Sequence, residues 1–490
     1  MRAGKLLILA LVLLTATRLG LVSLEEVSPA EAYYDLCAKI PAAAYFDGPA
    51  GTAALTGALG NFSRFSAPLW ALAATLACFQ LIRRIGDERR AAWTALALNA
   101  LPIFNVEALR AGPLLPALTF ALLALDFSWR AFAAERRGLL WWLAAGLALG
   151  LATCFAYAAW ALAPAIVLFT LCSAKHRRAD DVFGLLVFLF VPAFMLAPAL
   201  VWNASQDWIP LAGGTWQTLW QFDFSGFFVT LAQLLSAFSP LVFPALLVVW
   251  VAAFRGAQAH VRVRFLFLIA LPGVGLCLYF ALRGQYAGFL FLLAAPLLID
   301  KVLTVISSRS RGRVLAWVMF LPAVVFSVFG LIGSFRAGEG WKEAAGEVRN
   351  LFLEKSAEGG EGLFLIAGDA PIAAVLGYHL RDDLIPPAGH PTVYVAESQD
   401  ISNQFGLWPG YGDFVDAVQP ADEFFTEQKG ENPFMGRNAL YLSRESANDV
   451  PQAIKAAFES VTFLKSLPGA GGDPEPLYIY LCVNYQTLPL

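Results

Sequence analysis

The 490-residue chain has few charged residues. Asp, Glu, Lys and Arg make up 14% of it, against about 25% in soluble globular domains. The shortage is confined to residues 1–335, because residues 336–490 have an ordinary charge density. The composition therefore excludes a soluble enzyme, a disordered protein and a nucleic-acid-binding protein. The apolar runs are long and continuous, which also argues against a β-barrel, whose strands alternate.

Cysteine and histidine are scarce too, with six and four residues. Four of the cysteines lie within apolar segments, and the other two have no spacing that pairs them. The sequence therefore predicts neither a disulfide framework nor a zinc site. The histidines are scattered, so no metal-binding cluster is expected, and a requirement for a divalent metal stays open.

What the chain does have is a series of apolar segments close to the roughly 20 residues that span a membrane. Together they predict about eleven helices, the third of them short and either tilted or partly re-entrant. The segments are 5–22, 67–82, 91–104, 112–128, 139–155, 157–173, 182–202, 227–253, 265–282, 286–303 and 314–335. We expect a multi-span α-helical membrane domain over residues 1–335.

The basic residues predict how this domain is oriented. Alternate loops contain 19 Lys and Arg residues, whereas the loops on the opposite side contain 5. By the positive-inside rule the N-terminus is cytoplasmic, and residues 23–66, 203–226 and 336–490 lie on the outer side. A cleaved signal peptide is the alternative for the first segment, and it leaves residues 23–66 on the same side.

Residues 336–490 alternate between strand and helix patterns, which predicts a water-soluble C-terminal α/β domain. The expected strands are 362–368, 392–397, 438–444, 461–467 and 477–485. The expected helices are 341–354, 370–380 and 450–458, the last one capped by Asp449. No phosphate-cradling glycine motif is present, so this domain is expected to serve recognition or to act as a lid.

The first outer loop, residues 23–66, is long, and long connections are usually functional. It combines acidic residues with aromatic ones, including Glu31, Tyr34 and Asp47. Carboxylates at a membrane surface can accept protons, and aromatic rings can stack on a sugar or sit at the interface. The alternative is a solvated loop with an ordinary aromatic belt.

Three parts of the chain resemble one known family. In the first loop these are residues 29–34 (PAEAYY) and 45–49 (YFDGP), where the family has DEAYY and YFDHPP. Residues 201–208 (VWNASQDW) are similar to its WNxxHxW loop. Residues 393–398 (VYVAES) and 403–408 (NQFGLW) are similar to its QYDxW segment. The family is that of bacterial membrane glycosyltransferases related to dolichyl-phosphate-mannose–protein mannosyltransferases and lipid A aminoarabinose transferases.

This resemblance implies a GT-C architecture, in which an outer loop of a multi-helix membrane domain forms the active site below an outer soluble domain. It implies a polyprenyl-phosphate sugar donor and transfer with inversion. In the family mechanism a carboxylate base acts on the acceptor hydroxyl, and cations hold the departing lipid phosphate.

The catalytic motifs are degenerate. Ala30 replaces the family Asp that is most often assigned as the base, Gly48 replaces its His, and Ala50 replaces a proline. Residues 111–114 (AGPL) stand where the family has an Asp shortly before Pro-Leu. Residues 155–157 (FAY) stand in place of a Lys-Tyr pair.

Two acidic residues are candidates for the catalytic base. Glu31 is adjacent to the missing Asp, and Asp47 matches a family carboxylate. Glu107, in the next outer loop, has no counterpart in the family. The alternative for Glu31 and Asp47 is that they hold the loop together through backbone hydrogen bonds.

Three arginines at the outer ends of spans are candidates for binding the phosphate, because a guanidinium can hold phosphate oxygens bidentately. They are Arg18, Arg110 and Arg283. Related aminoarabinose transferases have a basic residue before a Tyr where this chain has Arg283 and Tyr286. Tyr34 and Tyr286 complete the predicted substrate site. The alternative for the arginines is snorkelling to the interface.

The leading hypothesis is therefore a glycosyltransferase of the bacterial inner membrane that uses a polyprenyl-phosphate-linked sugar. Its acceptor would be a lipid, a glycan or a protein of the envelope. One rival is a catalytically inactive relative that binds lipid-linked sugar or acts as a scaffold. The other is a transporter or flippase, which the nearly charge-free spans disfavour.

Overall fold

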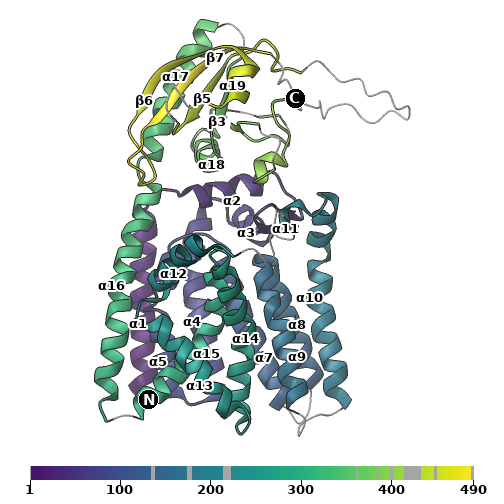
Figure 1. The fold of residues 1–490 in the computed structure, drawn as a ribbon, viewed down its shortest axis with the longest axis vertical. Helices are drawn as coiled ribbons and strands as arrows, with labels where there is room; N and C mark the ends of the chain where they lie inside the picture. The colour runs from purple at the N-terminus through teal and green to yellow at the C-terminus, as the bar shows by residue number, and fades with distance from the viewer. Residues whose placement is uncertain are drawn as a thin grey trace.

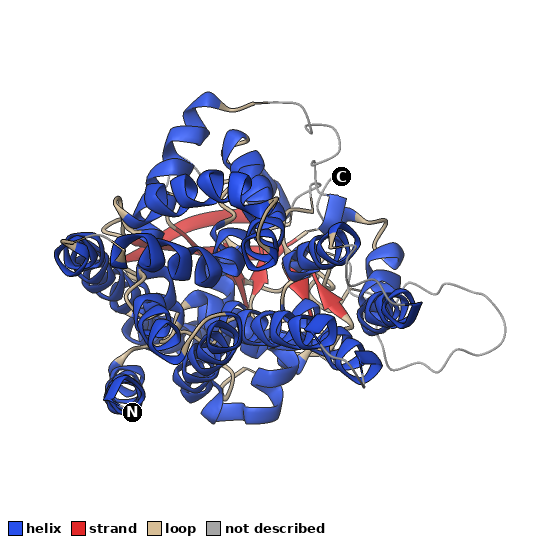
Figure 2. Ribbon diagram, turned by 90° about the horizontal axis from the view of Figure 1, so that it is seen from below, coloured by secondary structure: helices blue, strands red, loops and turns tan. Residues whose placement is uncertain are grey.

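The computed structural model describes residues 2–133, 138–173, 179–212, 222–308, 310–359, 362–384, 386–387, 389–397, 401–412, 432–445 and 450–486. Figure 1 shows a bundle of helices with a smaller α/β part stacked on one end, and the N-terminus at the other end. Seen along the bundle, the strands lie behind the helices (Figure 2). The long helices of the bundle thus lie apart from the sheet.

The bundle consists of long apolar helices, which satisfy their own backbone hydrogen bonds and so suit a lipid environment. They are α1 (Arg2–Leu24), α4 (Ser66–Ile85), α5 (Glu88–Leu98), α6 (Pro102–Glu107), α7 (Leu114–Ala133), α8 (Gly138–Phe155), α9 (Leu162–Cys172), α10 (Ala179–Ser205), α12 (Phe224–Phe238), α13 (Val242–Ala257), α14 (Val261–Leu282), α15 (Gly288–Ser307) and α16 (Gly312–Gly338). Short helices η1 (Gly60–Phe65), η2 (Tyr157–Ala161) and α11 (Ile209–Ala212) connect some of them.

Every one of the eleven predicted segments is helical, which confirms a multi-span α-helical protein. Among the described residues, eight helical stretches are long and apolar enough to cross a membrane, and the pair α12–α13 makes a ninth if it counts as one span. The segments at 91–104 and 157–173 are shorter helices, α5 with α6 and η2 with α9. The expected number of about eleven therefore includes two segments that do not span by length alone.

Two predicted spans are broken at prolines. The helices α12 and α13 bend by 95° at residues 239–241, where Pro240 follows Ser239. Between α5 and α6 the chain turns before Pro102, which occupies the first turn of α6. Proline lacks a backbone N–H and restricts the residue before it, so it begins a helix more readily than it continues one.

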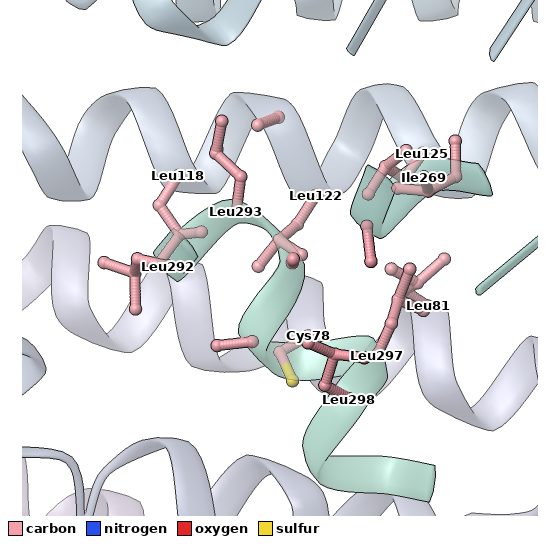
Figure 3. Packing of buried hydrophobic residues seen from close by; sticks show 14 of the residues in the cluster. Cys78, Leu81, Leu118, Leu122, Leu125, Ile269, Leu292, Leu293, Leu297 and Leu298 are labelled. Carbon is pink, nitrogen blue, oxygen red and sulfur yellow. The ribbon is translucent and has the colours of Figure 1, made fainter. Parts of the chain in front are cut away.

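The centre of the bundle is packed with leucine and other aliphatic side chains (Figure 3). Leu118 and Leu122 of α7 are fully buried together with Leu293 and Leu297 of α15. Cys78 of α4 lies in the same cluster as a small apolar side chain. This core fixes the helices against one another and therefore fixes the ends that reach the α/β part.

The α/β part contains α17 (Trp341–Gly359), α18 (Ala370–His379) and α19 (Gln452–Ala457) around a five-stranded sheet. The strands are β3 (Phe364–Ala367), β4 (Tyr394–Val395), β5 (Ala439–Ser443), β6 (Phe458–Leu467) and β7 (Leu477–Tyr485), in the order β4-β3-β5-β7-β6. The first three strands in this order are parallel, and the last three are antiparallel. The predicted α/β region is therefore present, although Asp449, its predicted helix cap, lies outside the described residues.

The first loop folds into α2 (Pro29–Lys39), the strands β1 (Ala44–Tyr45) and β2 (Gly48–Pro49), and α3 (Gly51–Leu59). Helix α2 lies across the end of the bundle, directly beneath α18 (Figure 1). Its residues Ala32, Leu36 and Cys37 are buried in one hydrophobic core with Leu376 of α18 and Leu365 of the sheet. The loop is thus packed as part of the α/β structure rather than as a solvated connection.

Charged residues at the opposite end of the bundle form buried ion pairs. The Asp126 carboxylate lies 2.6 Å from Arg84 Nε and 2.6 Å from Arg130 Nη2. Asp300 receives two bonds from Arg90, 3.1 Å from Nε and 2.6 Å from Nη2. Breaking such a pair strands a charge, so these contacts tie α4 to α7 and α5 to α15.

We expect Asp126→Ala to destabilise the bundle by about 1.5–3 kcal/mol, because the exposed Arg84 and the half-buried Arg130 both lose a charge-assisted hydrogen bond to the buried carboxylate. Thermal unfolding of the purified protein in detergent measures this effect. Lys39→Ala is the control, since its pair with Asp35 is exposed and contributes about 0.5 kcal/mol. Equal midpoints for the two variants would contradict the assignment.

Candidate functional site at the end of the helix bundle

The β1–β2 hairpin is held in place from three directions. The Tyr45 hydroxyl donates to the Cys37 carbonyl at 2.6 Å and accepts from the Ala42 amide at 3.2 Å, which ties the hairpin to α2. The Phe46 amide donates to Gln404 Oε1 of the α/β part at 2.7 Å. A Cβ on Gly51 would lie 2.3 Å from the Cys154 carbonyl oxygen, so a glycine is required for this close approach to α8.

Glu31 lies in a buried network that uses both of its carboxylate oxygens. Its Oε2 accepts from the Ser28 amide at 3.1 Å and from the Ser28 hydroxyl at 3.0 Å, completing a capping box at the start of α2. Its Oε1 accepts from Arg64 Nε at 3.2 Å and from the Ala111 amide at 3.3 Å. These contacts match the alternative of a carboxylate that holds the loop.

Glu31 and Arg64 also line a small open pocket of about 20 Å³, which has room for a water molecule or two. Asp35, Asn61 and Tyr378 contribute further polar groups to its wall. The pocket is therefore polar and lies between the first loop and helix α18 of the α/β part.

Asp47 is at the tip of the hairpin and is exposed. Burial raises the pKa of both Tyr33 and Tyr34, and the nearby negative charge of Asp47 adds to this effect. The negative charge of Glu107 also raises the pKa of Tyr34. The charges of both Asp47 and Glu107 thus act on Tyr34.

Glu107, at the end of α6, is half-buried, and among the described residues no hydrogen bond or ion pair engages its carboxylate. Burial raises its pKa to about 7, while Arg110 opposes the shift and Glu31 adds to it. The charge of Glu107 also contributes to the raised pKa of Tyr286, after the larger effect of burial. Glu107 therefore interacts electrostatically with Arg110 and Glu31 and with Tyr34 and Tyr286.

Arg110 lies three residues after Glu107, beyond the end of α6, and lines a second small pocket, of about 10 Å³. Its Nε donates to Ser334 Oγ of α16 at 2.9 Å, and the Ser334 hydroxyl donates to Glu25 at 2.7 Å. The same pocket is lined by Thr52, Thr56, Ser66 and Trp70. The Thr52 hydroxyl is buried without a hydrogen-bond partner among the described residues. A cation beside hydroxyl groups suits a phosphate or a sugar.

Neither of the other two predicted arginines lines these two pockets. Arg18 is buried within α1, where its Nη2 donates to Asn105 Oδ1 at 2.7 Å and its guanidinium lies over the Phe104 ring at 5.6 Å. Arg283 follows α14 and lies over the Tyr279 ring at 5.7 Å. Tyr286 follows Arg283 by three residues, and the charge of Glu107 helps to raise its pKa.

The segments that resemble the family contact one another in pairs. Gln404, in the third segment, binds the backbone of Phe46 in the first. Asn203, in the second, donates to the Tyr157 hydroxyl at 3.2 Å, and Tyr157 stands where the family has its Lys-Tyr pair. Trp408 is buried against Phe405, so it packs rather than presents its ring. Trp208 remains 45% exposed.

Comparison with known proteins agrees with this architecture. The family described as dolichyl-phosphate-mannose-protein mannosyltransferase matches residues 41–202, which include the hairpin, Glu107 and Arg110. None of the curated proteins matches the chain significantly. The sequence-based resemblance to this group of membrane glycosyltransferases is confirmed.

Solved structures show the same fold. ArnT from Cupriavidus metallidurans bound to undecaprenyl phosphate is 16% identical, with a TM-score of 0.59 over 99% of both chains. The same ArnT in the apo state is 15% identical, with a TM-score of 0.60 over 98% of both chains. The oligosaccharyltransferase AglB from Archaeoglobus fulgidus, in complex with an inhibitory peptide and a dolichol-phosphate, is 13% identical, with a TM-score of 0.51 over 76% of this chain and 64% of AglB. This chain is a membrane protein with the GT-C fold.

If Glu31 acts through the capping box, Ser28→Ala and Glu31→Ala should not be additive. We expect Ser28→Ala to lower the free energy of unfolding by about 1 kcal/mol. Glu31→Ala should cost more, because it also leaves Arg64 without its carboxylate. The double variant should be destabilised by about 0.5–1 kcal/mol less than the sum of the effects of the two single variants. Unfolding midpoints in detergent test this expectation, and strictly additive effects would contradict it.

Proposed function

We propose that this protein transfers a sugar from a polyprenyl-phosphate donor to an acceptor at the end of the bundle that carries the α/β domain. The observation that carries the proposal is the convergence of the first loop and residues 110–112 around two adjoining pockets. One pocket offers Arg110 with three hydroxyl side chains, and the other offers Glu31 and Arg64. The apolar helices below them suit a lipid tail.

In this proposal Arg110 binds the phosphate of the donor, assisted by the hydroxyl groups of Thr52, Thr56 and Ser66. A guanidinium that holds the departing phosphate lowers the barrier, because negative charge develops there as the sugar leaves. Tyr34 and Tyr286 are proposed to contact the sugar, and Asp47 to bind the acceptor. Arg18 and Arg283 are proposed as further contacts for the lipid phosphate on its way to the site.

The relatives support this donor class. The matched family is described as a mannosyltransferase that uses dolichyl-phosphate mannose. The similar solved structures hold undecaprenyl phosphate and a dolichol-phosphate respectively. The acceptor is proposed only as a class, namely a lipid, glycan or protein of the cell envelope.

We further propose that residues 1–335 form a domain within the bacterial inner membrane and that residues 336–490 form an extracytoplasmic domain. The basic loops favour a cytoplasmic N-terminus, and the α/β part lies at the end of the bundle opposite to it (Figure 1). The active site would then face the outer side of the membrane.

This orientation predicts that Glu347→Cys, on the exposed surface of α17, reacts with a membrane-impermeant maleimide in intact spheroplasts. Arg311→Cys, at the other end of the bundle, is the matched control and should react only after lysis. Mass shifts on a gel measure both reactions. The opposite pattern would place the α/β domain in the cytoplasm and would contradict the proposal.

A catalytically inactive relative that binds lipid-linked sugar is the second candidate. It is favoured by Ala30 in place of the family Asp and by the engagement of both Glu31 oxygens in hydrogen bonds. Such a protein would bind polyprenyl-phosphate sugars at the same pockets and would release no polyprenyl phosphate.

Transfer by the purified protein distinguishes the two functions. We expect the wild type, in lipid nanodiscs with a panel of polyprenyl-phosphate sugars and envelope acceptors, to release polyprenyl phosphate. Arg110→Gln should raise the donor KM about tenfold or more, since it removes a charge-assisted bond of about 1.5–3 kcal/mol. Arg349→Gln, which alters an exposed ion pair in the α/β part, is the control. Donor binding without any turnover would favour the inactive relative.

A further inference from the structure

Among the described residues, Glu107, like Glu26, has a carboxylate that no hydrogen bond or ion pair engages. Glu31 accepts four hydrogen bonds, and Glu25 accepts one from Ser334. Asp47 lies at the exposed hairpin tip. Among the described residues, only electrostatic contacts, with Arg110, Glu31, Tyr34 and Tyr286, connect Glu107 to its neighbours. A recessed carboxylate without donors remains available to take up a proton.

Glu107 also lies beside Gly112, in the segment where this chain lacks the Asp of the family. A Cβ built on Gly112 would lie 3.4 Å from Glu107 Oε2, in ordinary contact distance. Glu107 therefore places its carboxylate beside the backbone of residue 112. Residues 111–114 are the segment in which the family has an Asp before Pro-Leu and this chain has Ala and Gly. The long side chain of Glu107 thus places a carboxylate beside residue 112.

Gly112 and Arg110 both line the pocket proposed for the donor phosphate. Glu107 is consequently beside that pocket, and its charge, like that of Asp47, acts on Tyr34. An acceptor hydroxyl bound beside Gly112 would lie next to the Glu107 carboxylate. An inverting displacement needs a base of this kind on the acceptor side of the sugar.

We propose that Glu107 is the proton acceptor for the acceptor hydroxyl in the transfer reaction. This role rests on the proposed function. The hydroxyl oxygen forms a bond to the anomeric carbon while its proton moves to a Glu107 oxygen. The bond between the anomeric carbon and the phosphate oxygen breaks, and its electron pair leaves with the polyprenyl phosphate. Glu107 then releases the proton to water.

The surroundings of Glu107 set the pH at which this can happen. The charged and titratable groups that act on it are Arg110 beside it, Glu31 and Tyr34 of α2, and Tyr286 before α15. Helix α16, which packs against α6, presents the hydroxyl groups of Ser327 and Ser334. Because burial raises the pKa of Glu107 to about 7, the carboxyl is protonated below neutrality and becomes a base as the pH rises through 7.

The test compares wild type, Glu107→Gln and Asp47→Asn in the nanodisc transfer assay between pH 5.5 and 8.5. We expect the wild-type kcat to rise with a midpoint at about 7. Glu107→Gln should lower kcat by about 10²–10⁴-fold, with a donor KM within about threefold of wild type, and should abolish the rise. Asp47→Asn should keep the midpoint. Glu347→Gln, in an exposed ion pair of α17, is the control for handling and folding.

A second readout does not need turnover. The infrared carboxyl band that is absent from Glu107→Gln should titrate between pH 6 and 8 in the wild type. Wild-type transfer that Glu107→Gln leaves within about threefold in rate and unchanged in pH profile would overturn the role of Glu107 alone. A Glu107 band that titrates near pH 4.5 would do the same. Absence of transfer by the wild type would overturn the proposed function and this role with it.

Discussion

The burial of helix α2 in the core of the α/β part is the constraint on which the rest of the site depends. Ala32, Leu36 and Cys37 are almost fully removed from solvent between α18 and the sheet, and burying a side chain the size of leucine contributes about 1.5–3 kcal/mol. Because α2 cannot move without opening this core, the hairpin that follows it is held over the bundle. The bond from Phe46 to Gln404 adds a second attachment 358 residues away in sequence.

This arrangement places carboxylates that look alike in the sequence in different environments. Glu31 is surrounded by hydrogen-bond donors and is a fixed part of the loop, whereas Glu107 has a half-buried position with one opposing cation. Environments that differ in this way give neighbouring acids different roles. In the proposed mechanism, Glu107 takes the place of the family Asp that is absent at residue 30.

The sequence predicted the parts of the structure that depend on local pattern. The apolar runs located all eleven helical segments, and the strand expected at 477–485 coincides with β7. The breaks in two spans were missed, although Pro240 and Pro102 marked them. The structural role of Glu31 was also readable, because Ser28, Pro29 and Glu31 form the signature of a capping box.

The environment of Glu107 could not be predicted in the same way. It arises from contacts among α2, α6 and the segment before α15, which are distant in sequence, and from the space left beside Gly112. Residue type and spacing do not reveal that a carboxylate lacks donors. The pairing of Arg110 with Ser334 of α16 is likewise a product of the tertiary packing.

An experimental structure with bound undecaprenyl phosphate tests the central claim most directly. The account predicts that the phosphate lies in the pocket lined by Arg110, Thr52 and Thr56, within hydrogen-bonding distance of the guanidinium, with the lipid tail running down between apolar helices. A phosphate bound at the opposite end of the bundle, near Arg84 and Arg90, would contradict it.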